Sequence, residues 1–278
     1  RLPTRMKRRR GACLREELIH IMRLDDLCAA LECAVPPLDG CEDFDGAAFI
    51  PEPGREVRRI VLALDADTRT AAAAVNAGAD LLLTHHPMLY GGEPEAGSPQ
   101  YIARELLVSH GIAAISLHAR LDAARGGMND TLAGMLGVFD MPGLVPFGTP
   151  EAEGLGRIGT LRETSDGRSL ALVVKEVLGA PRVVLTCPEK KIRRAAVVTG
   201  SCSDFVPRAA ELGVDAIIGG EFKYHTLDYA LSVGICCIGA GHYYTERHAP
   251  EVLGRLVGAI LPAAEIIISD PGCPAEVL

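Results

Sequence analysis

The sequence contains no run of about 20 apolar residues, the length that a helix needs to cross a bilayer. The charged opening RLPTRMKRRR is not followed by the apolar stretch of a secretory signal. Nine cysteines are present, an odd number with no C-x-x-C pair, which argues against a disulfide framework and a structural zinc knot. We therefore expect a soluble, cytoplasmic protein that uses its cysteines as small core residues and has no membrane partner.

Familiar catalytic motifs are also missing. The chain has no G-x-S-x-G elbow and no P-loop, which excludes serine hydrolases and ordinary NTPases. The stretch GLGRIG (154–159) matches the dinucleotide fingerprint, but no strand precedes it and no amphipathic helix follows, so we interpret it as a turn into a strand. The net charge of −8 disfavours nucleic acid as a main partner.

The remaining composition is that of a folded protein. With 278 residues, 48% hydrophobic and 23% charged, the chain can bury the core of one large domain or of two ordinary ones. Residues 1–22 are expected to form a mobile basic tail, with a nucleic-acid contact or a transit segment as the alternatives. The first helix is predicted in MRLDDLCAALECA, before two prolines.

Strands and helices alternate after this helix. RRIVLALDA (58–66) reads as a strand, RTAAAAVNAG as a short helix, and DLLLT (80–84) as a buried strand. Strand, helix and strand with short connections predict a right-handed βαβ unit in a parallel sheet.

The same pattern returns later in the chain. AVNAGADLLLTHH and AAELGVDAIIGGE align at an offset of 135 residues, from Gly78 to Gly213, and SHGIAAISLH resembles SVGICCIGAGH. We infer an internal duplication, the alternative being chance similarity between two ordinary βαβ units. The predicted fold is α/β, with duplicated βαβ units in mainly parallel sheets sandwiched by helices. The halves are placed at 23–145 and 146–278, joined through the Gly/Pro-rich stretch near 142–156 and free to interleave into one compact unit.

Polar side chains follow the predicted strands at their carboxyl ends, where α/β sheets bind ligands. His85 and His86 follow DLLLT, whereas the other two strands lead into H-x-x-x-D and H-x-x-x-E. A four-residue spacing on a helical turn places imidazole and carboxylate on one face. The members of these two motifs are His118 with Asp122 in the first half, and His242 with Glu246 in the second.

Each of these signals has an ordinary explanation when taken alone. A single His-x-x-x-Glu is more often a solvated helix face, and a single strand-end histidine is usually a hydrogen-bonded core residue. Adjacent histidines point in different directions, however, and can serve two ions about 3.5–4 Å apart. The whole set is best explained by a two-metal site between the halves, with mixed N/O ligands that suit zinc, iron or manganese and with Glu246 as the natural bridge.

The blocks LLLTHHPMLY, LHARLDAARGGMND and GGEFKYH…GAGHYYTE resemble the signature blocks of the NIF-three-like dinuclear metal-centre proteins, the GTP cyclohydrolase 1 type 2 homologues. The resemblance runs from about Val57 to the C-terminus. It departs at His118-Ala119-Arg120-Leu121-Asp122, where the family usually has H-T-N-L-D, and at DFDGAAF (43–49), where it has D-N-x-G-L-Q.

The resemblance implies two divalent ions per chain and a homohexamer. It implies that His85, His242 and Glu246 bind one ion, and that His86, Asp122 and Glu246 bind the other. His118 would act beside the metals, orienting ligands or transferring protons, so Glu246 and His118 are the expected catalytic residues. Another polar cluster is expected to line a substrate pocket, with a capped helix start as the alternative: Glu221, Lys223, Tyr224 and His225.

Hydrolysis is the reaction class that a two-metal centre of this kind favours. By resemblance the substrate would be a nucleotide or a related heterocycle, with GTP ring opening as the specific version. The alternative is a non-catalytic, metal-binding or metal-handling oligomeric scaffold that binds protein partners.

Overall fold

A computed structural model describes residues 22–37, 48–49, 51–52, 54–89, 92–139, 145–149 and 152–276. Residues 1–21 of the predicted tail and most of DFDGAAF lie outside the described residues, whereas Met22 begins a short strand, β1 (Met22–Arg23), that pairs with β3 (Glu56–Val57). No helix in the described part of the chain is long and apolar enough to span a bilayer.

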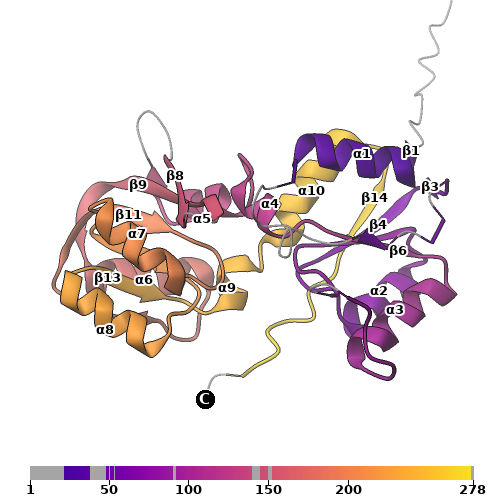
Figure 1. Cartoon of the computed structure of the whole chain (residues 1–278). Helices are drawn as coiled ribbons and strands as arrows, with labels where there is room; N and C mark the ends of the chain where they lie inside the picture. Colours follow the sequence, from indigo (N-terminus) through magenta and orange to yellow (C-terminus); the bar gives the residue numbers. More distant parts are fainter. Residues whose placement is uncertain are drawn as a thin grey trace, which may run out of the picture.

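The first of two lobes is built on a five-stranded sheet (Figure 1). Its central strands β4, β5 and β6 are parallel, and the buried Leu81–Thr84 strand shows the continuous apolar pattern of a sheet covered on both faces. The sheet order is β14 (Glu265–Ile268), β4 (Arg59–Ala63), β5 (Leu81–Thr84), β6 (Ala113–Ser116), β2 (Ala48–Phe49). The helices of this lobe are α1 (Leu24–Ala34), α2 (Thr68–Ala77), α3 (Pro99–Ser109) and α10 (Ala249–Ile260), and apolar cores fill both faces.

The second lobe holds a seven-stranded sheet with helices on both faces. The sheet order is β10 (Val184–Leu185), β13 (Cys236–Gly239), β12 (Ala216–Gly219), β11 (Lys191–Val197), β9 (Ala152–Asp166), β7 (Val138–Phe139), with β8 (Val145–Thr149) also paired to β9. Its helical segments are α5 (Met128–Met135), α6 (Gly167–Leu178), the 3-10 turn η1 (Ser203–Phe205), α7 (Val206–Glu211) and α8 (Tyr224–Val233). Two short helices, α4 (Ala119–Ala123) and α9 (His242–Glu246), lie between the lobes (Figure 1).

The predicted α/β class with helix-covered, mainly parallel sheets is confirmed. The two sheets also repeat each other in register: Ile60 lies opposite Leu81 in the first, and Ala195 lies opposite Ala216 in the second, each 135 residues further on. The stretch GLGRIG lies inside β9, which pairs antiparallel with β11, so it forms no βα turn for a dinucleotide.

The repeat extends to side-chain contacts. An aspartate just before the second parallel strand caps the start of the first parallel strand in both lobes, which fixes the register of the pair. Each carboxylate accepts hydrogen bonds of 2.8–3.0 Å from two successive backbone N–H groups, those of Arg58 and Arg59 for Asp80, and those of Arg193 and Arg194 for Asp215. These matched contacts favour duplication over chance similarity.

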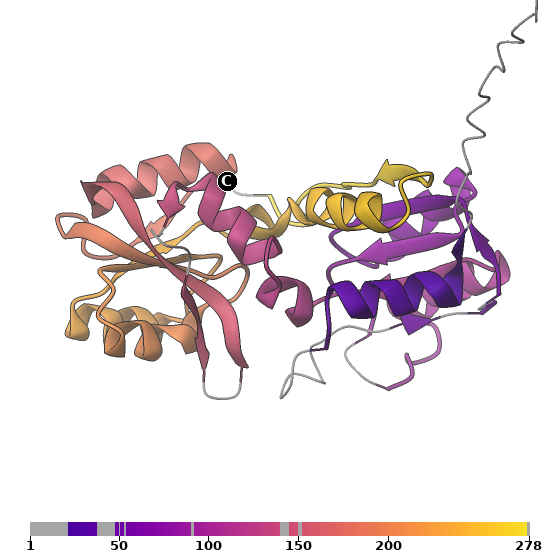
Figure 2. The same cartoon turned by 90° about the horizontal axis from the view of Figure 1, so that it is seen from above.

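The end of the chain crosses back to the first lobe (Figure 2). Helix α10 packs in the core of the first lobe, and β14 pairs with β4 in parallel. The lobes therefore differ from the sequence halves divided at residue 145, because the apolar face of α10 and the short strand β14 complete the first sheet rather than the second. After β14, the segment Ser269–Glu276 runs back toward the second lobe (Figure 1).

Candidate metal centre

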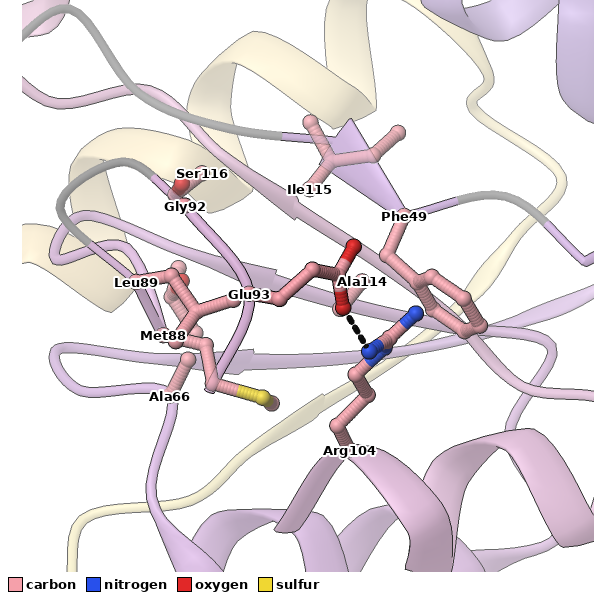
Figure 3. A pocket seen from close by; sticks show the side chains of 11 residues that line it. Phe49, Ala66, Met88, Leu89, Gly92, Glu93, Arg104, Ala114, Ile115 and Ser116 are labelled. Carbon is pink, nitrogen blue, oxygen red and sulfur yellow. Dashed lines mark hydrogen bonds and ion pairs between the residues drawn. The ribbon is translucent and has the colours of Figure 1, made fainter. Parts of the chain in front are cut away.

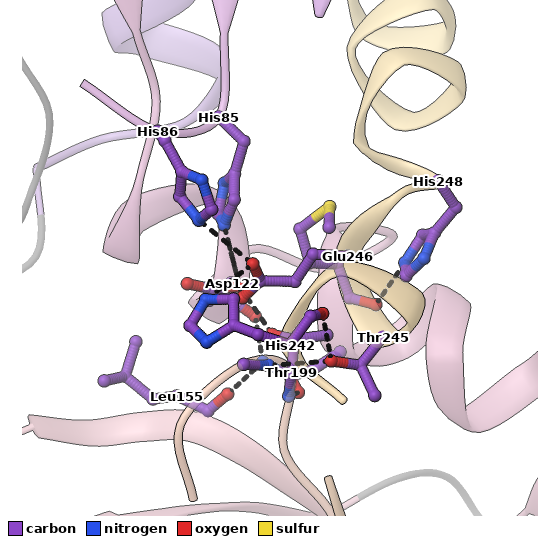
Figure 4. Close-up of polar contacts among 12 residues, drawn as sticks. His85, His86, Asp122, Leu155, Thr199, His242, Thr245, Glu246 and His248 are labelled. Carbon is purple, nitrogen blue, oxygen red and sulfur yellow. Dashed lines mark hydrogen bonds and ion pairs between the residues drawn. The ribbon is translucent and has the colours of Figure 1, made fainter. Parts of the chain in front are cut away.

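The six residues singled out at strand ends come together. Figure 4 shows five of them between the lobes: His85, His86, Asp122, His242 and Glu246. His85 and His86 follow β5, and Asp122 lies on α4, just beyond β6. From the other lobe, α9 contributes His242 and Glu246 on one helical face, as their four-residue spacing predicts. The expectation that ligands bind at the carboxyl ends of strands therefore identified side chains that come from both lobes and lie close together.

One group of facing ligand atoms contains two histidines and one carboxylate oxygen. Glu246 Oε2 lies 3.0 Å from Nε2 of His86 and 3.0 Å from Nε2 of His242. The carboxylate is buried, with 4% of its side chain exposed, while the His242 side chain is 44% exposed. This group therefore has one side toward solvent.

A second group is more deeply placed. His85 Nε2 lies 3.7 Å from Asp122 Oδ1 and 3.9 Å from Glu246 Oε1, and His85 is fully buried. The two oxygens of Glu246 thus face two different sets of ligand atoms. That arrangement suits a carboxylate that bridges two positions.

One atom at the centre of the cluster, His85 Nε2, is buried without a hydrogen bond. Buried polar atoms normally have a partner, so such an atom suits contact with a metal ion. Imidazole nitrogens and carboxylate oxygens that converge within 4.8 Å are a donor set for a divalent transition metal. The residues present therefore fit metal ions.

The pairing of the histidines differs from the ligand sets that the family resemblance implies. His85 groups with Asp122, and His86 groups with His242. The reason is local: the two imidazoles lie side by side (Figure 4), and Nε2 of His85 lies nearer to Asp122 of α4, whereas Nε2 of His86 lies against Glu246 of α9. The sequence alone does not determine which imidazole takes which direction.

His118 lies beside this cluster rather than apart from it. Its ring centroid is 5.1 Å from that of His85 and 5.5 Å from that of His86. Ligand atoms of these three histidines lie within 4.8 Å of one another. The position suits either a further ligand or the proton-transfer role predicted for His118, and that role stays a prediction.

Hydrogen bonds to the second ring nitrogen orient each of the paired histidines. The Nδ1 atom of His85 contacts the Leu117 carbonyl oxygen at 3.1 Å. His86 Nδ1 lies 2.7 Å from Asp65 Oδ1, and His242 Nδ1 lies 3.0 Å from Glu221 Oε1. Such contacts leave Nε2 as the free ligand atom and raise its basicity.

The charges of the cluster shift its pKa values. Burial lowers the pKa of His86, but the carboxylates of Asp65 and Glu246 outweigh it and raise the pKa to about 9. In the same way, the carboxylates of Glu221 and Glu246 outweigh burial and raise the pKa of His242 to about 10. Burial raises the pKa of Asp122 to about 6. Without metal these imidazoles hold protons at neutral pH, and bound ions have to displace them.

The lobes are joined beneath the cluster by a network that fixes Asp122. Thr199 Oγ1 donates to Asp122 Oδ1 at 2.8 Å, and the Thr199 N–H donates to Asn129 Oδ1 at 2.8 Å. Asn129 Nδ2 in turn donates to the Asp122 carbonyl oxygen at 3.2 Å. The buried Arg157 of β9 donates to the Ala123 carbonyl oxygen at 2.6 Å, so the second lobe holds α4 in place.

A glycine provides the space for the shared carboxylate. Gly200 follows β11 with a φ of 64°, and a Cβ built there would collide with Glu246 Oε1 and come within 3.0 Å of His242 Nε2. The position therefore requires glycine for two reasons, its backbone conformation and the close approach of the ligands.

Of the four residues expected in a substrate pocket, only Glu221 touches the cluster, through His242. Tyr224 is 86% exposed, and Lys223 and His225 are also exposed at the start of α8. The start of α8 has no side-chain cap, and the place of these three residues in a substrate pocket stays a prediction.

Several residues of this site were not singled out in the sequence: Asp65, Asn129, Thr199 and Gly200. Asp65 and Gly200 correspond at the offset of 135 residues, and both follow the first parallel strand of their lobe. The rule that found the histidines, applied to RRIVLALDA and RAAVVTG, would have found both. Asn129 offered no such signal, because its role depends on contacts across the lobes.

Asp65 provides a test of the His86 side of the cluster. In Asp65→Asn, the amide no longer supports His86 Nδ1 as a carboxylate does, so we expect zinc affinity at the His86 and His242 position to fall by roughly 10–100-fold. Competition with a chromophoric chelator measures it, and Asp25→Asn on the exposed face of α1 is the control. Unchanged affinity in Asp65→Asn would contradict the orienting role.

The fold and site define a class: a two-lobed α/β protein with groups of histidine and carboxylate between the lobes that could hold metal ions. The chain belongs to the Duf34/NIF3 (NGG1p interacting factor 3) family, whose model matches residues 22–271. The resemblance inferred from the three sequence blocks is thereby confirmed.

Two relatives described as GTP cyclohydrolase 1 type 2 homologues illustrate the similarity. The chain is 29% identical over 230 residues to that of Clostridium perfringens, covering 81% of this chain and 87% of the relative. It is 34% identical over 208 residues to that of Halobacterium salinarum, covering 72% and 80%. The crystal structure of Staphylococcus aureus protein SA1388 has the same fold, with a TM-score of 0.79, 20% identity, and coverage of 92% of this chain and 99% of that one.

Proposed function

We propose that the protein holds two divalent metal ions, zinc, iron or manganese, and uses them to hydrolyse a nucleotide or a related heterocycle. The observation that carries the proposal is the sharing of Glu246 between two facing ligand groups, with the buried His85 Nε2 left without a hydrogen bond beside it. The name of the relatives, GTP cyclohydrolase 1 type 2 homologue, supports GTP ring opening as the specific reaction.

Ions at these positions would supply Lewis acidity. They would also lower the pKa of water, so that water could lose a proton and act as a nucleophile at neutral pH. The chain's own part is to hold the ligands rigidly. Glu246 faces both groups, and Asp122 is fixed by Thr199. His118, beside both strand-end imidazoles, is placed to accept or donate a proton.

The test is GTP consumption by protein loaded with zinc, manganese or iron, followed by chromatography. Wild-type protein should consume GTP, and Glu246→Ala should abolish turnover because it removes the shared ligand. Glu251→Ala, on the exposed face of α10, is the matched control and should retain activity. Consumption of GTP by metal-loaded wild-type protein and Glu246→Ala at equal rates would refute the proposal.

Exposed apolar side chains favour a second candidate, a non-catalytic oligomeric scaffold that binds or handles metal for protein partners. Helix α6 exposes Leu172, Val173 and Val177, with 61% of Leu172 accessible. Full metal loading without turnover of GTP or any other nucleotide would favour this function over hydrolysis.

We further propose a homohexamer, as the family resemblance implies, with the apolar face of α6 covered between copies. Mass measurement in solution at micromolar concentration should give six chains, and a monomer would contradict the proposal. We place the protein in the cytoplasm, since the described cysteines are all free thiols, as a reducing compartment maintains them.

A further inference from the structure

A pocket of about 400 Å³ adjoins the metal-binding groups on the side of the second lobe. Its inner wall includes His242 and Glu221, whose side chains contact each other at 3.0 Å. The ends of β12 and β13 and the start of α9 contribute further lining residues, as do Cys273–Ala275 of the C-terminal segment. Its size lies within the range of small-molecule sites.

The walls of this pocket are aromatic, and glycines make room for them. Phe222 and Tyr244 line it together with Tyr243. A Cβ at Gly239 would approach the Phe222 ring at 3.3 Å, and one at Gly241 would approach the Tyr244 ring at 3.1 Å. The Phe222 and Tyr244 rings therefore lie directly against glycine backbone, and aromatic side chains are groups that planar rings contact favourably.

The C-terminal segment, which lines part of the pocket, is held by contacts near Asp270. Tyr243 Oη donates to Asp270 Oδ1 at 2.9 Å, and the Gly272 N–H donates to the same oxygen at 2.9 Å. Beyond this turn, Pro274 lines the pocket and also lines a neighbouring hollow that contains Asp65 and His86. The segment thus contributes lining residues to both hollows next to the metal-binding groups.

A different pocket, of about 300 Å³, lies in the first lobe between β6, β2 and α3 (Figure 3). Its cation is already engaged, since Arg104 pairs with Glu93 and lies over the Phe49 ring at 5.5 Å from the centroid. None of the six metal-binding candidates lines it. The pocket of the second lobe is therefore the better candidate for a ligand that reaches the metals.

We propose that the pocket formed by Phe222, Tyr243, Tyr244 and the C-terminal segment binds the planar heteroaromatic base of a nucleotide and presents its edge at His242. Phe222, Tyr243 and Tyr244 line the pocket together with His242, so a planar base in contact with these rings lies beside that imidazole. Arg182, which also lines the pocket, supplies positive charge for the phosphate. The inference rests on the proposed function and makes it more specific, because the base of the nucleotide, and not its phosphate, would lie next to the metals.

Calorimetric titration of zinc-loaded protein tests the proposal, with GMP and ribose 5-phosphate as probes that differ by the base. GMP should bind, and ribose 5-phosphate should bind at least about 10-fold more weakly, because it lacks the aromatic contacts. Phe222→Leu keeps apolar bulk without the ring, and Ala275→Trp fills the pocket from the exposed tail. Each variant should weaken GMP binding by about 10-fold with unchanged zinc content.

Tyr229→Leu is the matched control, because this half-exposed aromatic of α8 does not line the pocket. Its GMP affinity should equal that of wild type. The proposal is overturned if zinc-loaded protein does not bind GMP, if ribose 5-phosphate binds as tightly as GMP, or if both pocket variants bind GMP as wild type does.

Turnover separates this proposal from the proposed function. If GMP binding depends on Phe222 and Ala275 as described but no nucleotide is consumed, the pocket stands and hydrolysis falls. If GTP is consumed with the same KM in wild type, Phe222→Leu and Ala275→Trp, hydrolysis stands and the pocket proposal falls.

Discussion

Glu246→Gln is expected to empty both metal positions, the largest loss of binding that any single replacement in the site should cause. Glu246 Oε2 faces His86 and His242 at 3.0 Å, while Oε1 faces His85 at 3.9 Å. Glutamine removes the charge and leaves one acceptor oxygen, so it can no longer serve both groups. Because orienting contacts alone are worth roughly 10–100-fold in metal affinity, losing the shared ligand should cost more than about 100-fold at each position.

Asp122→Asn should act on one position only. Asp122 faces His85 at 3.7 Å and belongs to the deeper group, so its loss should spare the ion held by His86 and His242. Elemental analysis at fixed free zinc gives metal per chain for each variant, with Glu251→Gln as the control and thermal unfolding as the check that each variant is folded. Equal losses from Asp122→Asn and Glu246→Gln would show that Glu246 is not the bridge.

The fold was predictable where local patterns decide it. Buried strands such as Leu81–Thr84 are recognisable in the sequence as short apolar runs, and the alignment of Gly78 with Gly213 indicates the repeat. The crossing of α10 and β14 into the first lobe was not predictable, because an amphipathic helix and a short apolar strand fit either sheet. The two sheets differ in the strand that pairs with the first strand of each repeat: β14 runs parallel to β4, whereas β9 runs antiparallel to β11.

The candidate site was predictable to a similar degree. Ligands of α/β sheets bind at the carboxyl ends of the strands, so the histidines and carboxylates could be found from their positions just after predicted strands. The direction in which each imidazole leaves β5 depends on what packs around it, and so the grouping of His85 with Asp122 emerged only in three dimensions. Lys223 and Tyr224 follow β12 in the same manner, yet the turn of the chain into α8 directs them to solvent.

Gly200→Ala is expected to weaken metal binding strongly although it changes no ligand. An added Cβ would occupy the space of Glu246 Oε1 and come within 3.0 Å of His242 Nε2, so the shared carboxylate would have to move. Displacement of a bridging ligand should lower zinc affinity at both positions by at least about 10-fold, comparable with the loss of an orienting contact. The backbone adds a separate cost, because alanine at a φ of 64° is disfavoured by roughly 1–2 kcal/mol.

Gly213→Ala separates these two effects. Gly213 has the same φ of 64°, but a Cβ there meets nothing within 4 Å. Gly213→Ala should therefore lose free energy of unfolding from backbone strain alone, measured on metal-free protein, and Gly200→Ala should lose at least as much. Only Gly200→Ala should lose zinc in competition with a chelator. Wild-type zinc affinity in Gly200→Ala, or an equal loss in Gly213→Ala, would mean that the close packing of Gly200 against Glu246 does not position the carboxylate.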